Sequence, residues 1–403
     1  MERIEARWRH PLIAFKALEG QSDAHLLHPG NSSVNADYSY IVAFPRERIV
    51  SSADDQKYWR HLVEVVESRK MSAHPGAPPL VSGLVGYVGY EAVRAFEPSL
   101  QLPGSPYALP DCAFGVYDGV CAFDRNNRKL VIYGKNSSVC DELYHALENS
   151  PEASENADAA SRWSIEAEKT QARFEADVAD VIERILDGEV FQANIAHRLC
   201  ARRNRGGGAL DLLERISSAS DAEFGALLQY DSGSILSNSP ERFFRITSHD
   251  GERTISTEPI KGTRPRSSCA ERDQQMAEQL LADPKDRAEN IMIVDLLRND
   301  LSKICDDHSI RVPRLCELMS LSKVHHLVSQ ITGTLRNDVS VTDVFGALFP
   351  CGSITGAPKV QAMKVISEIE GIGRGPYCGA IGYISDTGVA DFSVAIRTTI
   401  LAN

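Results

Sequence analysis

The amino-acid sequence predicts a mixed α/β protein, and three observations support this fold class. Residues 1–148 contain short apolar runs broken by glycine, proline and aspartate, a pattern typical of strands. After residue 166, segments with the apolar spacing of a helix alternate with strand-like segments. The 403 residues are 43% hydrophobic and 24% charged, so the chain has enough apolar material for a globular protein with an extensive core.

The N-terminal region, residues 1–148, is expected to be rich in strands that pack on the rest of the chain. The predicted strands span 39–44, 80–90, 114–123 and 129–133, and one helix spans 56–67. Residues 149–165 are expected to form a linker, because the letters SPEASENADAA within them are polar, acidic and poor in β-branched residues.

The second region, residues 166–403, begins with a predicted helix that Thr170 caps and Gly188 ends. Residues 190–199 alternate as a strand that places Gln192 on the face opposite Phe191, and solvent is the usual side for such a glutamine. The later predicted strands span 224–230, 234–238, 242–247, 379–385 and 389–401, and the later helices span 271–282, 286–298 and 358–370. The last two strands are expected to form one hairpin.

Composition excludes some classes of function. The formal net charge of −12 argues against nucleic acid as a main partner, because phosphate backbones require a basic surface. A small anionic substrate remains possible, since a site needs only local positive charge. Nine cysteines without a CxxC pair indicate reduced thiols in a cytoplasmic protein. The sequence has no run of about 18 apolar residues and no apolar signal-peptide core near its start, so no membrane association is expected.

The octet PIKGTRPR contains the first candidate for chemistry, Lys261. Because Lys261 lies between Pro259 and Gly262, we expect a turn that presents its amine outside any regular helix or ladder. An amine attacks only in its neutral form, which is scarce at pH 7 for an unperturbed lysine. A partly buried site beside Arg264 and Arg266 would favour the neutral amine. The octet alone equally fits a surface-loop lysine.

Two further segments are candidates for binding charged groups. Asp286 and Glu289 are three residues apart on a predicted helix, where they either interact with the helix dipole or hold a hard cation such as magnesium. The letters GSITGAPK, residues 352–359, precede the predicted helix 358–370 and resemble an anion cradle at a helix start. Many helices begin in this way, so the second signal is weak by itself.

Eight segments in the same order indicate a family. They are HLLH, GLVGYVGY, LPDCAFGVYD, SPERF, PIKGTRPR, DPKDRAENIMIVDLLRND, VHHLVS and FPCGSITGAPKVQAM. With these segments the chain resembles the chorismate-utilising enzymes over nearly its whole length, and most closely their aminodeoxychorismate synthase branch. The resemblance implies an α/β (α+β) fold in which two β-sheets form a sandwich flanked by helices.

The activity that the resemblance implies is amino-group transfer to chorismate. The product would be 4-amino-4-deoxychorismate, a step of p-aminobenzoate and folate synthesis, with Mg²⁺ as cofactor. Ammonia would come from a separate glutamine amidotransferase subunit. Two alternatives stay open, namely the large component of anthranilate synthase and a catalytically inactive chorismate-binding subunit.

The resemblance also assigns roles to residues. Lys261 would be the nucleophile, which related anthranilate synthases replace with alanine, Glu241 the general acid and His326 an active-site histidine. The substrate would be lined by Gly262, Thr263, Thr355, Gly356, Tyr377, Arg397 and Gln192. Tyr377 and Arg397 would bind the enolpyruvyl carboxylate, and Gln192 stands where relatives that add water carry a lysine base. Glu289, with Asp286 behind it, would hold magnesium.

Two features of the resemblance concern segments outside the catalytic motifs. The family continues past the last predicted strand to a glycine-rich segment and a helix with paired glutamates, so a chain ending at Asn403 is expected to carry half of the metal ligands and to be of uncertain activity. The segment from Leu26 to Ser33 resembles the place where relatives bind a regulatory amino acid. The sequence does not decide whether one binds here.

Overall fold

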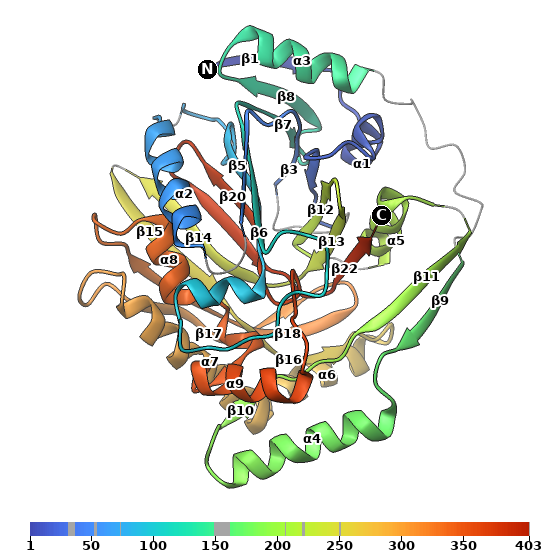
Figure 1. The fold of residues 1–403 in the computed structure, drawn as a ribbon, viewed down its shortest axis with the longest axis vertical. Helices are drawn as coiled ribbons and strands as arrows, with labels where there is room; N and C mark the ends of the chain where they lie inside the picture. Colours follow the sequence, from blue (N-terminus) through green and yellow to red (C-terminus); the bar gives the residue numbers. More distant parts are fainter. Residues whose placement is uncertain are drawn as a thin grey trace.

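Two large β-sheets face each other and helices cover their outer surfaces (Figure 1). The structure is a computed structural model, and it describes residues 1–30, 37–51, 55–72, 74–148, 162–205, 207–219, 222–249 and 251–402. Every strand pairing within these residues is antiparallel. The sandwich of two sheets that the sequence predicted is therefore confirmed.

The first sheet combines strands from both ends of the chain. Its order is β1 (Glu2–Ala6), β8 (Lys129–Gly134), β7 (Gly119–Asp124), β3 (Tyr38–Val42), β2 (His25–Leu27), β12 (Phe224–Tyr230), β13 (Gly233–Ser239) and β22 (Thr398–Ala402). Three helices pack on it: α1 (Pro11–Phe15), α3 (Ser137–Glu148) and α5 (Ala209–Ala219).

The second sheet is also assembled from distant segments. Its order is β16 (Ile260–Pro265), β18 (Val324–Thr334), β15 (Glu252–Glu258), β14 (Arg242–His249), β21 (Ala390–Val394), β20 (Ala380–Ser385), β5 (Gly83–Val88), β6 (Cys112–Tyr117) and β4 (Glu47–Ser51), and β17 (Arg311–Ser320) also pairs with β18. The helices on this side are α2 (Gln56–Arg69), α6 (Ala270–Ala282), α7 (Pro284–Ser302) and α8 (Val341–Leu348).

The remaining elements are short or lie at the edges of the sandwich. They are α4 (Gln171–Leu186), α9 (Lys359–Glu370), β9 (Arg162–Ala167) paired with β11 (Leu199–Arg205), β10 (Gln192–Ala193) paired with β19 (Gly356–Ala357), and the 3₁₀ turns η1 (Lys16–Leu18), η2 (Tyr90–Ala95) and η3 (Gly352–Ile354). Thr170 caps α4 as predicted, since its side chain accepts a hydrogen bond from the Arg173 amide. No helix among the described residues is long and apolar enough to span a bilayer.

Both regions contribute strands to both sheets. Tyr40 and Tyr133 of the first sheet pack against Val85, Tyr117 and Tyr383 of the second, and all five side chains are buried. The N-terminal strands β4, β5 and β6 thus lie beside β20 within one sheet. Region 1–148 therefore packs on residues 166–402. Its strands are interleaved with those of the second region within both sheets, and the two regions share a core.

Three sequence predictions need correction. Residues 149–161 of the predicted linker lie outside the described residues, and 162–165 belong to strand β9. The predicted strand 190–199 is reduced to the two residues of β10, which pair with β19, while Leu199 begins β11 and pairs with β9. The predicted strand 389–401 is split, since β21 ends at Val394 and β22 leaves for the other sheet. Arg397 at this break has a φ of 51°, so strict alternation cannot continue through it.

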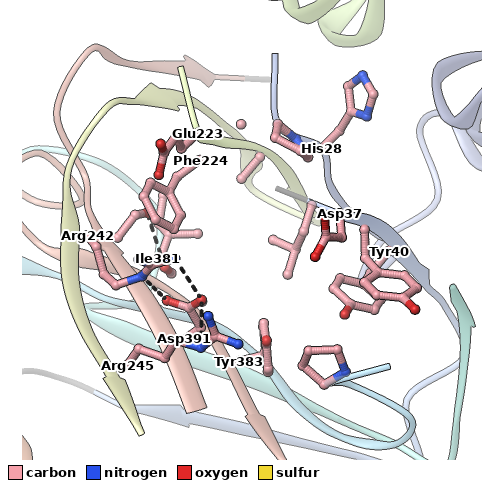
Figure 2. A pocket seen from close by; sticks show the side chains of 18 residues that line it. His28, Asp37, Tyr40, Glu223, Phe224, Arg242, Arg245, Ile381, Tyr383 and Asp391 are labelled. Carbon is pink, nitrogen blue, oxygen red and sulfur yellow. Dashed lines mark hydrogen bonds and ion pairs between the residues drawn. The ribbon is translucent and has the colours of Figure 1, made fainter. Parts of the chain in front are cut away.

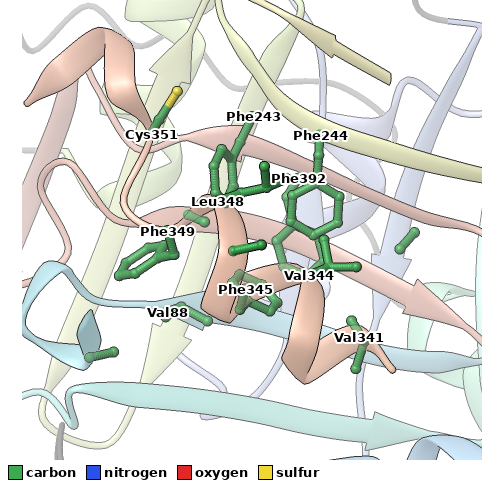
Figure 3. Close-up of a cluster of buried hydrophobic side chains, with 14 of the residues drawn as sticks. Val88, Phe243, Phe244, Val341, Val344, Phe345, Leu348, Phe349, Cys351 and Phe392 are labelled. Atoms are coloured by element: carbon green, nitrogen blue, oxygen red, sulfur yellow. The ribbon is translucent and has the colours of Figure 1, made fainter. Parts of the chain in front are cut away.

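The largest buried cluster lies between the second sheet and α2, α7 and α8. Figure 3 shows Phe345 of α8 among Phe243, Phe244, Phe349 and Phe392. The ring centroid of Phe345 is 5.2 Å from that of Phe392 and 5.4 Å from that of Phe244. This packing joins α8 to strands β14 and β21.

Phe345→Ala is expected to lower the free energy of unfolding by about 3 to 5 kcal/mol, because it leaves a cavity among aromatic rings. Urea titration of the purified variant measures this loss. Phe191→Ala is the matched control, since this ring is 75% exposed and its removal should change stability by no more than about 0.5 kcal/mol. Equal losses in the two variants would contradict the assignment of the core.

Candidate active site

Lys261 lies on β16, an edge strand, and this corrects the prediction of a turn outside regular structure. β16 pairs with β18, and its register shifts between Lys261 and Thr263. Gly262 occupies this bulge with a φ of 82°, and a Cβ there would lie 3.0 Å from both Leu280 and Asp286. The two prolines of the octet lie just before β16 and at its last residue. An edge strand with a bulge tolerates them there, because they interrupt no central ladder. The bulge changes the side-chain alternation directly after Lys261.

The Lys261 amine forms an ion pair with Glu289 of α7. The distance from Lys261 Nζ to Glu289 Oε1 is 2.9 Å, and the lysine side chain is 15% exposed. Gln192 Nε2 donates a 2.8 Å hydrogen bond to the same oxygen. Burial acts to raise the pKa of Glu289, but the hydrogen bond and charge of Lys261 outweigh it and hold that pKa below its ordinary value. Three predicted site residues thus meet at one oxygen atom.

The two arginines of the octet do not act as the predicted cationic neighbours of Lys261. Arg264 forms ion pairs with Asp283 at 2.8 Å and with Asp286 at 3.0 Å. Arg266 forms an ion pair with Asp273 at 2.8 Å. Both arginines are therefore paired with carboxylates of their own. The charged partner of Lys261 is Glu289 and not an arginine.

Glu241 is a buried carboxyl group next to Lys261. It precedes β14 and is 4% exposed, and the Ser353 hydroxyl donates a 2.5 Å hydrogen bond to its Oε1. Burial raises the pKa of Glu241 to about 7, although the Ser353 hydrogen bond, the Lys261 charge and the Ile260 amide each act to lower it. At neutral pH this carboxyl group therefore exists in both protonation states.

His326 completes the strand pair that carries Lys261. Its Nδ1 lies 2.9 Å from the Thr263 hydroxyl, and its buried Nε2 has no hydrogen-bond partner among the described residues. Burial lowers the pKa of His326 and the positive charge of Arg397 lowers it further, so the neutral imidazole is favoured. The neighbouring His325 instead contacts Ser320 and Asp273, as expected for adjacent residues on a strand.

The predicted cradle is tied to Gln192 through the main chain. Gln192 pairs with Ala357, and a Cβ on Gly356 would lie 2.0 Å from the Gln192 carbonyl oxygen, so only glycine allows this approach. Thr355 is fully buried and its hydroxyl donates to the Cys351 or Gly352 carbonyl. The Gln192 Oε1 atom is buried without a hydrogen-bond partner among the described residues.

Tyr377 is connected to this group of residues through Arg374. The Arg374 guanidinium lies 5.8 Å from the Tyr377 ring centroid and donates a 2.6 Å hydrogen bond to the Asn194 carbonyl. The Asn194 amide in turn donates to the Thr355 carbonyl at 2.8 Å. Arg374 and Asn194 therefore hold the Tyr377 loop against the cradle.

Two carboxylates offer hard oxygen donors for a metal ion. Glu289 and Asp286 both lie on α7, but Asp286 already has Arg264 as its partner. No group of three or more histidine, cysteine or acidic residues able to hold a metal occurs within the described part of the chain. Magnesium needs only one or two carboxylates when substrate and water supply the other oxygens. Both carboxylates already have basic partners, Lys261 at Glu289 and Arg264 at Asp286, so each fits such a site only if a bound ion joins or replaces that partner.

A separate cavity of about 250 Å³ lies between the two sheets (Figure 2). Its lining includes Tyr40, Tyr383 and the ion pair of Arg242 with Asp391, whose atoms are 3.0 Å apart. None of the twelve predicted site residues lines it. Leu27, His28 and Pro29 of the segment that resembles the regulatory amino-acid site of relatives do line it, and residues 31–33 of that segment lie outside the described residues.

Ser353 is the functional candidate that sequence reasoning missed. Its motif was recognised as a cradle, but nothing in the letters GSITGAPK indicated that a hydroxyl would reach Glu241, 112 positions away. A hydroxyl within a glycine-rich turn was the only available signal. Arg374 was missed for a similar reason, because its partners lie on segments distant in sequence.

The sequence model of the chorismate binding enzyme family matches residues 28–403. The chain therefore belongs to this family. Aminodeoxychorismate synthase component 1 from Klebsiella aerogenes is 34% identical over 400 residues, which cover 95% of this chain and 86% of that protein. Anthranilate synthase component 1 from Streptomyces coelicolor is 32% identical over 419 residues, which cover 98% of this chain and 79% of that protein. The family resemblance predicted from the motifs is confirmed.

A solved structure shows the same fold. The crystal structure of anthranilate synthase component I from Streptococcus pneumoniae TIGR4 superposes with a TM-score of 0.80 at 28% identity. The match covers all of this chain and 92% of that chain. The fold and the family together define a chorismate-utilising enzyme.

Proposed function

We propose that this protein converts chorismate and ammonia to 4-amino-4-deoxychorismate and water. The observation that carries the proposal is the juxtaposition of a lysine amine with a buried carboxyl group whose pKa is about 7. A nucleophile and a proton donor in one site are the two groups that displacement of a hydroxyl requires. The likeness to aminodeoxychorismate synthase component 1 proteins at 34–37% identity supports the same activity.

The first step forms a covalent adduct. The neutral amine of Lys261 attacks ring carbon 2, the two ring double bonds shift, and the bond between carbon 4 and its hydroxyl breaks. Glu241 gives its proton to the departing oxygen, which leaves as water. The effect of the Lys261 charge on the Glu241 carboxyl supports a site that contains both groups, and the ammonium group paired with Glu289 must lose its proton before the attack.

The second step releases the product. Ammonia attacks carbon 4, the two double bonds shift back, the nitrogen of Lys261 leaves carbon 2, and a proton of the new ammonium group returns to the Glu241 carboxylate. Gln192 Oε1 is buried without a hydrogen-bond partner among the described residues, and we propose that it accepts a hydrogen bond from the incoming ammonia. A glutamine is not a base, so this position gives no help to water as a competing nucleophile.

Binding of the dianionic substrate assigns roles to the other residues. Tyr377 and Arg397 would hold the enolpyruvyl carboxylate, and an arginine fork suits a carboxylate because it donates two parallel hydrogen bonds. Thr263 and His326 would face the ring, since the His326 Nε2 atom lacks a partner among the described residues. Glu289, and Asp286 once it leaves Arg264, would hold Mg²⁺, which supplies positive charge opposite the ring carboxylate.

The source of ammonia is part of the proposal. The relatives are named component 1, which implies a second component, and we propose that a glutamine amidotransferase subunit supplies ammonia to this chain. Free ammonium salts should replace that subunit in a purified system, because ammonia itself is the reactant.

An anthranilate synthase activity is the second candidate, favoured by the 32% identity to the Streptomyces coelicolor relative over 98% of the chain. Incubation with chorismate, Mg²⁺ and ammonium separates the two. We expect an aminated product without anthranilate fluorescence, together with a protein adduct in intact-mass spectra. A fluorescent anthranilate product would overturn the proposed function.

Gln192→Lys is expected to change the nucleophile that the site accepts. A lysine there supplies a base for water and loses the amide that donates to Glu289, so the aminated product should fall by about tenfold or more while a hydroxylated isomer of chorismate becomes detectable. Chromatography of the products measures the ratio. Gln361→Lys is the control, since this glutamine contacts Glu189 on the surface and should leave the ratio unchanged.

A further inference from the structure

The Ser353 hydroxyl stands in a chain of three side chains that ends at the proposed acid. Ser353 is 5% exposed, and its Oγ lies 2.5 Å from Glu241 Oε1 and 3.2 Å from Cys351 Sγ. Because the single hydroxyl proton is donated to the carboxyl group, the thiol of Cys351 is left as the donor to the hydroxyl oxygen. Burial raises the pKa of Cys351 to about 12, so the thiol keeps its proton at neutral pH.

The turn that carries Ser353 is fixed by close packing. It belongs to η3, and a Cβ on the preceding Gly352 would lie 2.4 Å from a Leu296 methyl group on α7. The Glu241 backbone is fixed as well, because its amide donates to Ser239 and its carbonyl accepts from the Val394 amide. Both ends of the hydrogen bond are therefore anchored independently of each other.

We propose that Ser353 is a positioning residue that holds Glu241 in one rotamer and, by donating to Oε1, makes Oε2 the oxygen that carries the proton to be transferred. This inference rests on the proposed role of Glu241 as the acid. A carboxyl oxygen that already accepts a hydrogen bond is the less basic of the two, so the proton favours the other oxygen. Glu241 would then meet the leaving oxygen with a defined atom.

The groups around the Glu241 carboxyl allow a clear expectation. The charged and titratable neighbours are Lys261 on β16 and Cys351 in the turn, and the Ile260 amide also donates to the carboxylate. The hydrogen bond from Ser353 favours the charged form, and its removal should therefore raise the pKa of Glu241 above about 7. Loss of the hydroxyl should let the acid stay protonated at higher pH while it is less well oriented.

The test compares Ser353→Ala with Ser353→Thr and follows adduct formation on Lys261 by rapid-quench intact-mass spectrometry from pH 5.5 to 9. In Ser353→Ala we expect the alkaline limb to move up by about one pH unit and the plateau rate to fall on the order of tenfold. Ser353→Thr, which keeps the hydroxyl, should restore the position of the limb. Cys351→Ala should move the limb in the same direction by less, because it weakens the donor only indirectly.

A second measurement is independent of the reaction. Infrared difference titration of the chorismate-free protein follows the carbonyl band of the protonated carboxyl group, and Glu241→Gln identifies that band by its loss. The band should persist to higher pH in Ser353→Ala. Ser82→Ala is the matched control, since Ser82 donates a 2.7 Å hydrogen bond to a buried carboxylate, Asp386, that contacts Arg69 away from the site residues.

The outcomes separate this inference from the proposed function. A slower Ser353→Ala variant with an unmoved alkaline limb and an unmoved infrared titration would mean that Ser353 only supports the fold, and would overturn the inference. The inference is supported if the alkaline limb and the infrared titration both move to higher pH in Ser353→Ala and stay in place in Ser82→Ala. If the parent protein forms no adduct, the proposed function fails, whereas the infrared titration still decides whether Ser353 sets the protonation of Glu241.

Discussion

Lys261→Ala is expected to abolish the covalent adduct and to lower the rate of amination by at least ~10³-fold, because no other amine replaces the nucleophile. Intact-mass spectra of the variant with chorismate and Mg²⁺ measure the adduct, and a coupled assay measures the product. The variant should remain folded, since Lys261 lies at a sheet edge and its partner Glu289 is partly exposed.

Two further variants distinguish the loss of the Lys261 nucleophile from the loss of its positive charge. Lys261→Arg keeps a positive charge beside Glu289 but cannot lose its proton, so it should also form no adduct. Lys285→Ala is the matched control, because the Lys285 charge also acts on Glu289 and yet this lysine has no place in the proposed chemistry. An adduct of normal mass and rate in Lys261→Ala would show that another residue is the nucleophile.

Glu241→Gln is expected to slow adduct formation by ~10² to 10⁴-fold, because an amide of the same shape cannot give a proton to the departing oxygen. The parent protein should lose activity as pH rises through about 7, since the raised pKa of Glu241 means that the proton donor is depleted above that pH. The residual activity of Glu241→Gln should lack this limb. Single-turnover rates from pH 5.5 to 9 measure both effects.

A second buried glutamate makes this pH test specific. Burial raises the pKa of Glu91 to about 7 as well, although the Arg374 and Gly375 amides that donate to it act in the opposite direction. Glu91→Gln should therefore keep the alkaline limb that Glu241→Gln loses. Disappearance of the limb in Glu91→Gln instead would assign it to the loop that Glu91 holds and not to the proposed acid.

Local sequence patterns predicted most helices and several strands. They did not predict where the chain passes from one sheet to the other. The predicted helices 56–67 and 286–298 and the helix between Thr170 and Gly188 lie within a few residues of the observed bounds of α2, α7 and α4. The segment 389–401 alternates throughout and was predicted as one strand, yet it divides between two sheets at residues 395–397. Alternation describes residue types along the chain, whereas β21 is buried on both faces and β22 is only partly buried, so the pattern could not show that the chain changes sheets.

The candidate site shows the same division between local and tertiary information. The role of Lys261 as a nucleophile stays a prediction, but its predicted neighbours were wrong. Arg264 pairs with Asp283 and Asp286, and Arg266 pairs with Asp273. It could not identify Glu289 as the ion-pair partner of the lysine, because the two are 28 positions apart on different elements.

The sequence by itself determined the family, the class of substrate and the candidate residues for the proposed chemistry, because a motif records side-chain chemistry directly. The tertiary structure alone decided which of these side chains meet and in what environment. The pKa of Glu241 depends on its burial and on Ser353 and Lys261, and all three follow from packing between distant segments. Desolvation and hydrogen bonding are properties of the folded surroundings, and no local spacing of residues encodes them.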